Sequence, residues 1–210
     1  MNNLVIITSF LESKFNIKSM ILPSDYVICT DGGYDIAQTY DLTPNLLMGD
    51  FDSIESPLPS DINIERFPPE KDYTDLELAL KKAMELNADN VTIIGGIGGR
   101  LDHTFANIQL LSSYTNNFTS LTLVDGKNKC FVLNDNQSQG ITIPQEDGSY
   151  ISLFSLSAKC TGVTFQGVKY PLDNAELTRE FPLGVSNEFV KKEAALSVKD
   201  GTLLVIISKK

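Results

Sequence analysis

The chain has 210 residues, of which 42% are hydrophobic and 21% charged. This composition is typical of a globular protein with one large core or two smaller ones. A net charge of −10 argues against nucleic acid as the main partner, because phosphate backbones are bound by clustered Lys and Arg.

Signals for export or membrane insertion are missing from the sequence. No apolar run approaches the roughly 20 residues that span a bilayer, and no basic segment precedes the first apolar run, Leu4–Phe10. Cys29, Cys130 and Cys160 are scattered without metal spacing, as expected of reduced core thiols. We therefore expect a cytoplasmic protein with no membrane partner.

Up to about residue 125, apolar runs alternate with helical patterns. A capping box at Thr74 and Glu77 opens a helix that we expect to reach about Asn87, and a second is expected from about Leu101 to Tyr114. The alternation predicts a mainly parallel sheet with helices on both faces, which binds ligands beyond the carboxyl ends of its strands. The predicted strands are Leu4–Thr8, Tyr26–Thr30, Leu46–Met48, Val91–Ile94 and Leu121–Val124.

After residue 125 the pattern becomes β-rich. Turn dipeptides recur at Asp125-Gly126, Asp147-Gly148 and Asp200-Gly201, and only a short helical turn is expected, near Asn174–Glu180. This half is typical of a small antiparallel sandwich or barrel. Its predicted strands are Tyr150–Leu156, Gly162–Tyr170, Ala194–Val198 and Thr202–Ser208.

Acids gather where the predicted strands end or the helices begin. Asp50 and Asp52, in GDFDS, follow a strand, and a turn after Gly49 could converge both carboxylates on one cation. Carboxylate oxygens are ligands that Mg²⁺ prefers. The alternative is a polar turn closed by an aspartate side chain.

Two further clusters repeat this theme. Asp72 and Asp75, in KDYTD, flank the start of the first predicted helix, where acids also stabilise a helix simply by facing its dipole. Asp31 and Gly32 follow the second predicted strand, where they could equally form an ordinary turn. The spacing alone does not decide between ligand binding and local structure.

The segment GGIGGRLDH, residues 95–103, lies between a predicted strand and a predicted helix. Its glycines permit close backbone approach to a ligand, a helix N-terminus attracts anions, and Arg100 offers a forked phosphate donor. It is neither a Walker A loop nor GxGxxG. The alternative for this segment is a flexible tight turn. His103 is the only histidine, and a single histidine early in a helix more often forms a structural hydrogen bond than acts in catalysis.

These motifs together resemble the thiamine pyrophosphokinases of bacteria over nearly the whole chain. In chain order they are DGG at 31–33, GDFDS at 49–53, KDYTDLELAL at 71–80, GGIGGRLDH at 95–103 with Asn107, GVKYPL at 167–172 and SNE at 186–188. The resemblance implies an α/β parallel-sheet nucleotide-binding domain, residues 1–125, that binds ATP. It implies a smaller all-β sandwich domain, residues 126–210, that binds thiamine.

The resemblance also implies the reaction and the assembly. Members transfer pyrophosphate from ATP to the hydroxyethyl oxygen of thiamine, giving thiamine diphosphate and AMP. They are homodimers, with each active site between the nucleotide domain of one subunit and the sandwich of the other.

Residue roles carried over from the family are as follows. Mg²⁺ and phosphates are assigned to Asp50, Asp52, Asp75 and Asp102, with Arg100 as the phosphate-contacting arginine and Gly98 and Gly99 as the backbone cradle. Catalysis is assigned to Asp50, Asp75, Arg100 and Asp102, and either Asp75 or Asp102 could accept the hydroxyl proton. Further ATP contacts are expected from Asp31, Gly32, Asp72, Thr74, His103 and Asn107. Thiamine is assigned to Ser186, Asn187 and Tyr170, which stands where some members have a Trp that this chain lacks.

Two other functions remain open from the sequence. A metal-dependent nucleotide-sugar transferase or phosphohydrolase could use the Asp50 and Asp52 pair. A non-enzymatic thiamine or nucleotide sensor could share the fold, although a sensor has no need for acids in every cluster.

Overall fold

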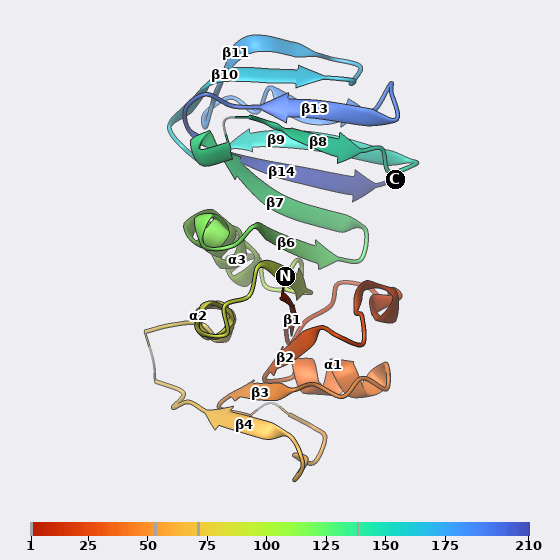
Figure 1. The fold of residues 1–210 in the computed structure, drawn as a ribbon, viewed down its shortest axis with the longest axis vertical. Coiled ribbons are helices and arrows are strands. Elements are labelled where there is room, and N and C mark those ends of the chain that lie inside the picture. Colours follow the sequence, from red (N-terminus) through yellow and green to blue (C-terminus); the bar gives the residue numbers. More distant parts are fainter. Residues whose placement is uncertain (1, 53, 71, 138) are drawn as a thin grey trace. The chain divides into compact units, whose positions relative to one another are not determined.

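The computed structural model describes residues 2–52, 54–70, 72–137 and 139–210 (Figure 1). Two sequence motifs therefore extend beyond the described residues, GDFDS at Ser53 and KDYTD at Lys71. The chain separates into two compact units, Met1–Gly126 and Lys127–Lys210. Within the described ranges, no helix has the length and apolarity needed to cross a membrane.

The first unit is built on a parallel sheet with strand order β6-β5-β1-β2-β3-β4. Its strands are β1 (Asn3–Ile7), β2 (Tyr26–Thr30), β3 (Leu46–Gly49), β4 (Asn63–Arg66), β5 (Asn90–Ile94) and β6 (Ser120–Asp125). The inner strands are apolar because both of their faces are covered. Five of the six strands match the sequence predictions. The exception, β4, has no buried residue along its length.

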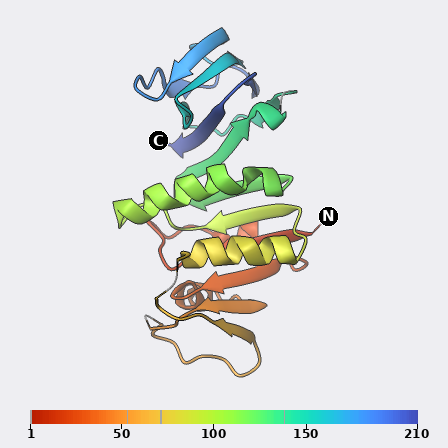
Figure 2. The same ribbon diagram turned by 90° about the vertical axis from the view of Figure 1, so that its left-hand side faces the viewer.

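Three α-helices cover this sheet, with α2 and α3 on one face and α1 on the other (Figures 1 and 2). They are α1 (Gly33–Thr39), α2 (Asp75–Glu85) and α3 (Leu101–Tyr114), supplemented by the short 3₁₀ helices η1 (Ile17–Met20) and η2 (Thr115–Asn117). One half of the predicted capping box forms at the start of α2, where the Thr74 hydroxyl accepts the Glu77 N–H at 3.2 Å. The Glu77 carboxylate accepts a hydrogen bond from Tyr114 of α3 at 3.0 Å, which ties the two helices together.

The start of α1 shows why a glycine is needed there. A Cβ on Gly33 would lie 2.1 Å from the carbonyl oxygen of Ile7, so only a glycine lets the helix approach β1 this closely. On that face, an apolar cluster that includes Val5, Val27 and Tyr34 fills the space between helix and sheet.

The second unit consists of two sets of antiparallel strands, β12-β9-β14-β7 and β11-β10-β13-β8. Their side chains share one apolar core, in which Ile151, Phe165, Leu196 and Val205 are almost completely buried. The elements are β7 (Asn128–Asn134), η3 (Asp135–Gln137), β8 (Ile141–Pro144), β9 (Ser149–Ser155), β10 (Lys159–Gln166), β11 (Leu172–Thr178), β12 (Gly184–Glu188), β13 (Glu193–Ser197) and β14 (Thr202–Lys209).

The short helical turn expected near Asn174–Glu180 was wrong. Most of that segment belongs to β11, which pairs with β10 along its length and buries Leu177 in the core. Its other side chains are exposed or half-buried, so the segment lacks the apolar alternation from which a strand is predicted. Cross-strand pairing, which no local pattern reveals, decides its conformation.

Candidate active site

A cavity of about 320 Å³ lies in the first unit, beyond the carboxyl ends of β1, β2 and β5. This is the edge of a parallel sheet where ligands bind. Seven of the residues singled out in the sequence line it: Asp31, Thr74, Asp75, Gly98, Arg100, His103 and Asn107. The remaining candidates of this unit do not line it, although the structure describes them: Gly32, Asp50, Asp52, Asp72, Gly99 and Asp102.

Asp31 is held in an unusual conformation directly after β2. Its φ of 42° lies in the left-handed region, and its carboxylate accepts the Phe51 N–H at 3.2 Å. A Cβ on Gly49 would lie 1.7 Å from the Asp31 Oδ1 atom, so a glycine is required there. Gly49 at the end of β3 therefore leaves the space that the Asp31 carboxylate occupies.

Asp31 and Asp75 are hydrogen-bonded to each other through their side chains. Burial raises the pKa of Asp31 to about 7, and the hydrogen bond and negative charge of Asp75 and the charge of Asp50 act in the same direction. Two acids this close do not readily ionise together. The pocket therefore contains a site of negative potential that a proton or a cation can relieve.

The GDFDS segment forms the polar turn, closed by an aspartate side chain, that was the alternative to a cation site. Asp50 Oδ1 accepts the Asp52 N–H at 3.1 Å, and Phe51 between them has a left-handed φ of 64°. Asp52 is exposed, whereas Asp50 is half-buried and close enough to influence Asp31 electrostatically. Among the described residues, no three His, Cys, Asp or Glu side chains form a ready-made metal site.

The glycine loop after β5 is closed by hydrogen bonds within the first unit. The Gly98 N–H donates to the Thr104 hydroxyl at 3.0 Å, and the Asn107 amide donates to the Gly96 carbonyl at 2.8 Å. A Cβ on Gly99 would lie 2.8 Å from the Phe10 ring, so the loop packs directly on the segment after β1. Because the Gly98 N–H already has a partner, a phosphate would have to replace the Thr104 hydroxyl to receive it.

Arg100 and Asp102 form an exposed ion pair at the start of α3. The Arg100 Nε donates to Asp102 Oδ1 at 3.2 Å, and Nη2 donates to Oδ2. The hydrogen bond from Arg100 lowers the pKa of Asp102 below its ordinary value. Arg100 lines the cavity, whereas Asp102, although paired with it, does not.

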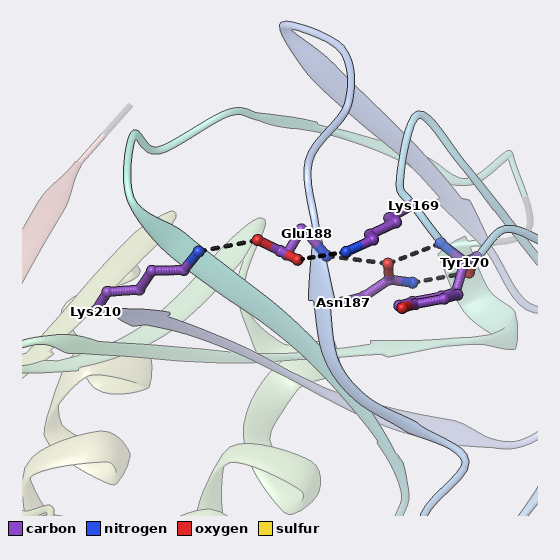
Figure 3. Close-up of polar contacts among 5 residues, drawn as sticks. All are labelled: Lys169, Tyr170, Asn187, Glu188 and Lys210. Atoms are coloured by element: carbon purple, nitrogen blue, oxygen red, sulfur yellow. Dashed lines mark hydrogen bonds and ion pairs between the residues drawn. The ribbon is translucent and has the colours of Figure 1, made fainter.

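Tyr170, Ser186 and Asn187 lie in the second unit and have very different surroundings; Figure 3 shows the contacts of Tyr170 and Asn187. Tyr170 is 62% exposed, whereas Asn187 is buried. The Asn187 carbonyl oxygen accepts the N–H groups of Tyr170 and Glu188, both at 3.0 Å, and its amide donates to the Tyr170 carbonyl at 2.8 Å. Asn187 therefore holds the turn that carries Tyr170.

Lys169 lies beside this tyrosine and belongs to a chain of ion pairs that continues through Glu188 to Lys210. Lys169 Nζ lies 5.5 Å from the centre of the Tyr170 ring and 3.1 Å from a carboxylate oxygen of Glu188. The other oxygen of Glu188 accepts from Lys210 at 2.9 Å. Ser186 has a left-handed φ of 58°, and its N–H donates to the Ser152 hydroxyl at 2.9 Å.

Sequence reasoning missed two acids that anchor loops of the first unit. Asp35 of α1 accepts the N–H groups of Glu55 and Ser56, at 3.0 and 2.9 Å, and so fixes the segment after GDFDS. Asp125, which was interpreted as part of a turn dipeptide, is completely buried at the end of β6. Asp125 is the last residue of β6, much as Asp31 and Asp50 directly follow β2 and β3, and this position could have marked it as a candidate site residue.

Comparisons with known proteins agree with this arrangement. Residues 17–123 match the family model "Thiamin pyrophosphokinase, catalytic domain", and residues 138–203 match "Thiamin pyrophosphokinase, vitamin B1 binding domain". The chain is 33% identical to the thiamine pyrophosphokinase of Bacillus subtilis over 80% of its own length and 79% of that protein. It is 23% identical to thiamin pyrophosphokinase 1 of Caenorhabditis elegans over 86% of this chain and 78% of the relative.

Solved structures give the same result. The crystal structure of the Bacillus subtilis thiamine pyrophosphokinase superposes with a TM-score of 0.89 at 28% identity, covering 100% of both chains. That of the Geobacillus thermodenitrificans thiamin pyrophosphokinase superposes with a TM-score of 0.86 at 28% identity, covering 99% of this chain and 98% of the other. The chain belongs to the thiamine pyrophosphokinase family.

Proposed function

We propose that this protein transfers pyrophosphate from ATP to thiamine, giving thiamine diphosphate and AMP. The observation that carries the proposal is the convergence of paired acids, a glycine loop and Arg100 on one cavity in the unit that matches the family's catalytic domain. Its volume of about 320 Å³ suits a small-molecule ligand. The names of the relatives support the same reaction.

ATP would occupy the cavity of the first unit, with its phosphates toward Arg100 and the glycine loop. Arg100 offers a forked donor, and His103 adds a second polar group at the start of α3. Phe10 and Leu76 supply apolar wall next to these groups. This mixture of a few polar groups and apolar surface is typical of nucleotide pockets.

The acids around Asp31 fit a hard divalent cation. Burial, Asp75 and Asp50 all raise the pKa of Asp31, so negative charge at this site is unfavourable without a counter-ion, and a divalent cation would supply one. Asp50, Asp52 and Asp75 would hold Mg²⁺, and Asp102 could join them only by leaving Arg100. A bound Mg²⁺ supplies charge neutralisation for the triphosphate.

The chain's own residues would then position and stabilise the reacting groups. The thiamine hydroxyl oxygen bonds to the β-phosphorus of ATP, the bond from that phosphorus to its bridge with the α-phosphate breaks, and AMP leaves with the electron pair. Arg100 stabilises the charge that develops on the phosphoryl oxygens. Of the two acids considered for the hydroxyl proton, Asp75 lines the cavity and Asp102 does not, which favours Asp75.

Thiamine would be recognised by the second unit of a partner subunit in a homodimer. Two observations support thiamine recognition by this unit. Residues 138–203 match the vitamin B1 binding model, and the ring of Tyr170 is exposed, so that a cationic thiazolium can stack on it. Ser186 and the turn held by Asn187 would complete that surface. We place the reaction in the cytoplasm, consistent with three buried free thiols.

A substrate panel tests this function against its alternatives. Purified protein with Mg²⁺ is given ATP with thiamine, ATP alone, or a set of nucleotide sugars, and initial rates are compared. Turnover that requires both ATP and thiamine supports the proposal. Nucleotide-sugar turnover, or thiamine-independent ATP hydrolysis, would establish a transferase or hydrolase, and ligand binding without any turnover would establish a sensor.

A further inference from the structure

The buried carboxylate of Asp125 binds two loops of the first unit, the one after β1 and the one after β5. It accepts the Glu12 N–H with both oxygens, at 3.0 and 3.2 Å, and the Ile97 N–H at 3.2 Å. The residue has no exposed surface. A carboxylate that receives several N–H groups in a buried site makes strong, charge-assisted hydrogen bonds.

Both loops form walls of the cavity. Phe10 lines it from the segment after β1, and Gly96 and Gly98 line it on either side of Ile97. The loops also touch directly, because the Gly96 N–H donates to the Phe10 carbonyl at 2.9 Å. A Cβ on Gly98 would lie 1.9 Å from the Glu12 carboxylate, so the spacing between the loops is narrow.

The turn after β6 strengthens this arrangement. Gly126 has a left-handed φ of 56°, and a Cβ there would lie 2.4 Å from the Ser13 hydroxyl. The chain therefore leaves β6 in direct contact with the segment that Asp125 binds. An aspartate suits its position better than an asparagine, because an amide nitrogen would face a backbone N–H in place of one acceptor.

We propose that Asp125 is a positioning residue that sets the distance between the two loops around the nucleotide phosphates. It does not line the cavity, so it acts through the backbone of Glu12 and Ile97. This inference rests on the proposed ATP site in that cavity. A purely structural anchor would stabilise the fold without affecting how tightly either substrate binds.

The test measures binding and kinetics for Asp125→Asn in the full-length protein. The KM for ATP and the Kd of a fluorescent ATP analogue should rise about tenfold, because one charge-assisted hydrogen bond becomes a repulsive contact. The KM for thiamine should change little. A fall in melting temperature with both ATP constants unchanged would overturn the inference.

Two further variants keep the test decisive. Asp25→Asn is the control, since the Asp25 carboxylate also accepts two N–H groups, the backbone N–H of Leu22 at 2.8 Å and the side-chain amide of Asn3 in β1 at 3.3 Å, but it lies before β2 and does not line the cavity. It should lower stability without changing the ATP constants. If Asp125→Asn does not fold, Gly126→Ala disturbs the same contact more mildly and should raise the ATP constants in the same direction, while unchanged constants would overturn the inference.

The wild-type protein separates failure of this inference from failure of the proposed function. If the wild type neither binds the ATP analogue nor forms AMP, the proposed function fails and takes the inference with it. If the wild type does both and Asp125→Asn binds ATP equally well, only the inference fails.

Discussion

Asp31 and Asp75, which both line the cavity, share a side-chain hydrogen bond, although one follows β2 and the other opens α2. The contact holds because Gly49 leaves room for the Asp31 carboxylate and the Phe51 N–H fixes its orientation. Acids in this arrangement destabilise the ligand-free protein near neutral pH, since one of them must retain a proton or both must repel. Acids with raised pKa values are frequent at sites that bind a cation or transfer a proton.

Removing either acid proposed to hold the cation should abolish turnover while preserving the fold. We expect Asp50→Asn and Asp75→Asn each to lower kcat on the order of 100-fold, because charge stabilisation in the transition state is lost. Circular dichroism and steady-state kinetics at saturating Mg²⁺ check this. Asp41→Asn, an exposed acid paired with Lys18, is the control and should retain full activity. Near wild-type rates in both site variants would make the acids structural.

Gly49 should be required for the geometry of Asp31. Gly49→Ala places a Cβ where the Asp31 carboxylate lies and also strains a φ of +151°, so we expect kcat to fall with a stability loss of about 1–3 kcal/mol. Gly148→Ala is the matched control, because its φ of +69° is also strained but no atom lies within 4 Å of the added Cβ. It should cost stability alone. Wild-type kcat in Gly49→Ala would show that the position of Asp31 does not matter.

Complementation between two defective chains tests the proposed shared active site. Asp75→Asn damages the first unit and Tyr170→Ala the second, so each homodimer should be inactive at limiting thiamine. Random mixing by co-refolding should restore about a quarter of the wild-type activity, because half of the dimers are hybrids with one intact site of two. Activity no greater than the sum of the two parents, or a fully active monomer by light scattering, would contradict a site shared between subunits.

Asp35 should make stability depend on acidic pH. Burial raises the pKa of Asp35, but hydrogen bonds from Ser56 and Glu55 outweigh it, so the folded-state pKa lies below the ordinary value of 3.8. Such a group stabilises the fold above its unfolded pKa and ceases to do so as pH falls through its folded pKa. Urea unfolding should show Asp35→Asn less stable than wild type by about 1 kcal/mol at pH 7, and equal to it near pH 2. An equal difference at both pH values would contradict this account.

The sequence predicted many of the elements with strong apolar periodicity, but the strands β4, β7, β8, β11 and β12 were not among the predicted ones. The inner strands of the first unit and the helices α2 and α3 appear where they were expected. The strands β4, β11 and β12 each have at most one buried residue, and their pairing partners determine their conformation. The strand β7 is different, because four of its seven residues are buried and it was still missed. The seven-residue helix α1 is too short for a clear period, and its close contact with β1 depends on Gly33.

The sequence identified several residues of the candidate site but not the hydrogen bonds that join them. Motif order identified Asp31, Asp75 and Arg100, yet only the folded chain shows that the first two share a hydrogen bond and that Arg100 binds Asp102. The role of Asp125 depends on backbone groups of Glu12 and Ile97, and backbone contacts leave no trace in residue type. Such contacts are set by loop geometry, which periodicity does not reveal.

The central claim is that two phosphoryl groups move together from ATP to thiamine, and a product balance tests it most directly. Protein, ATP, thiamine and Mg²⁺ are incubated, and every nucleotide and thiamine product is quantified by chromatography and ³¹P NMR. We predict AMP and thiamine diphosphate in equal amounts, with neither formed when thiamine or Mg²⁺ is omitted. ADP with thiamine monophosphate as the main products, or AMP formed equally well without thiamine, would contradict the account.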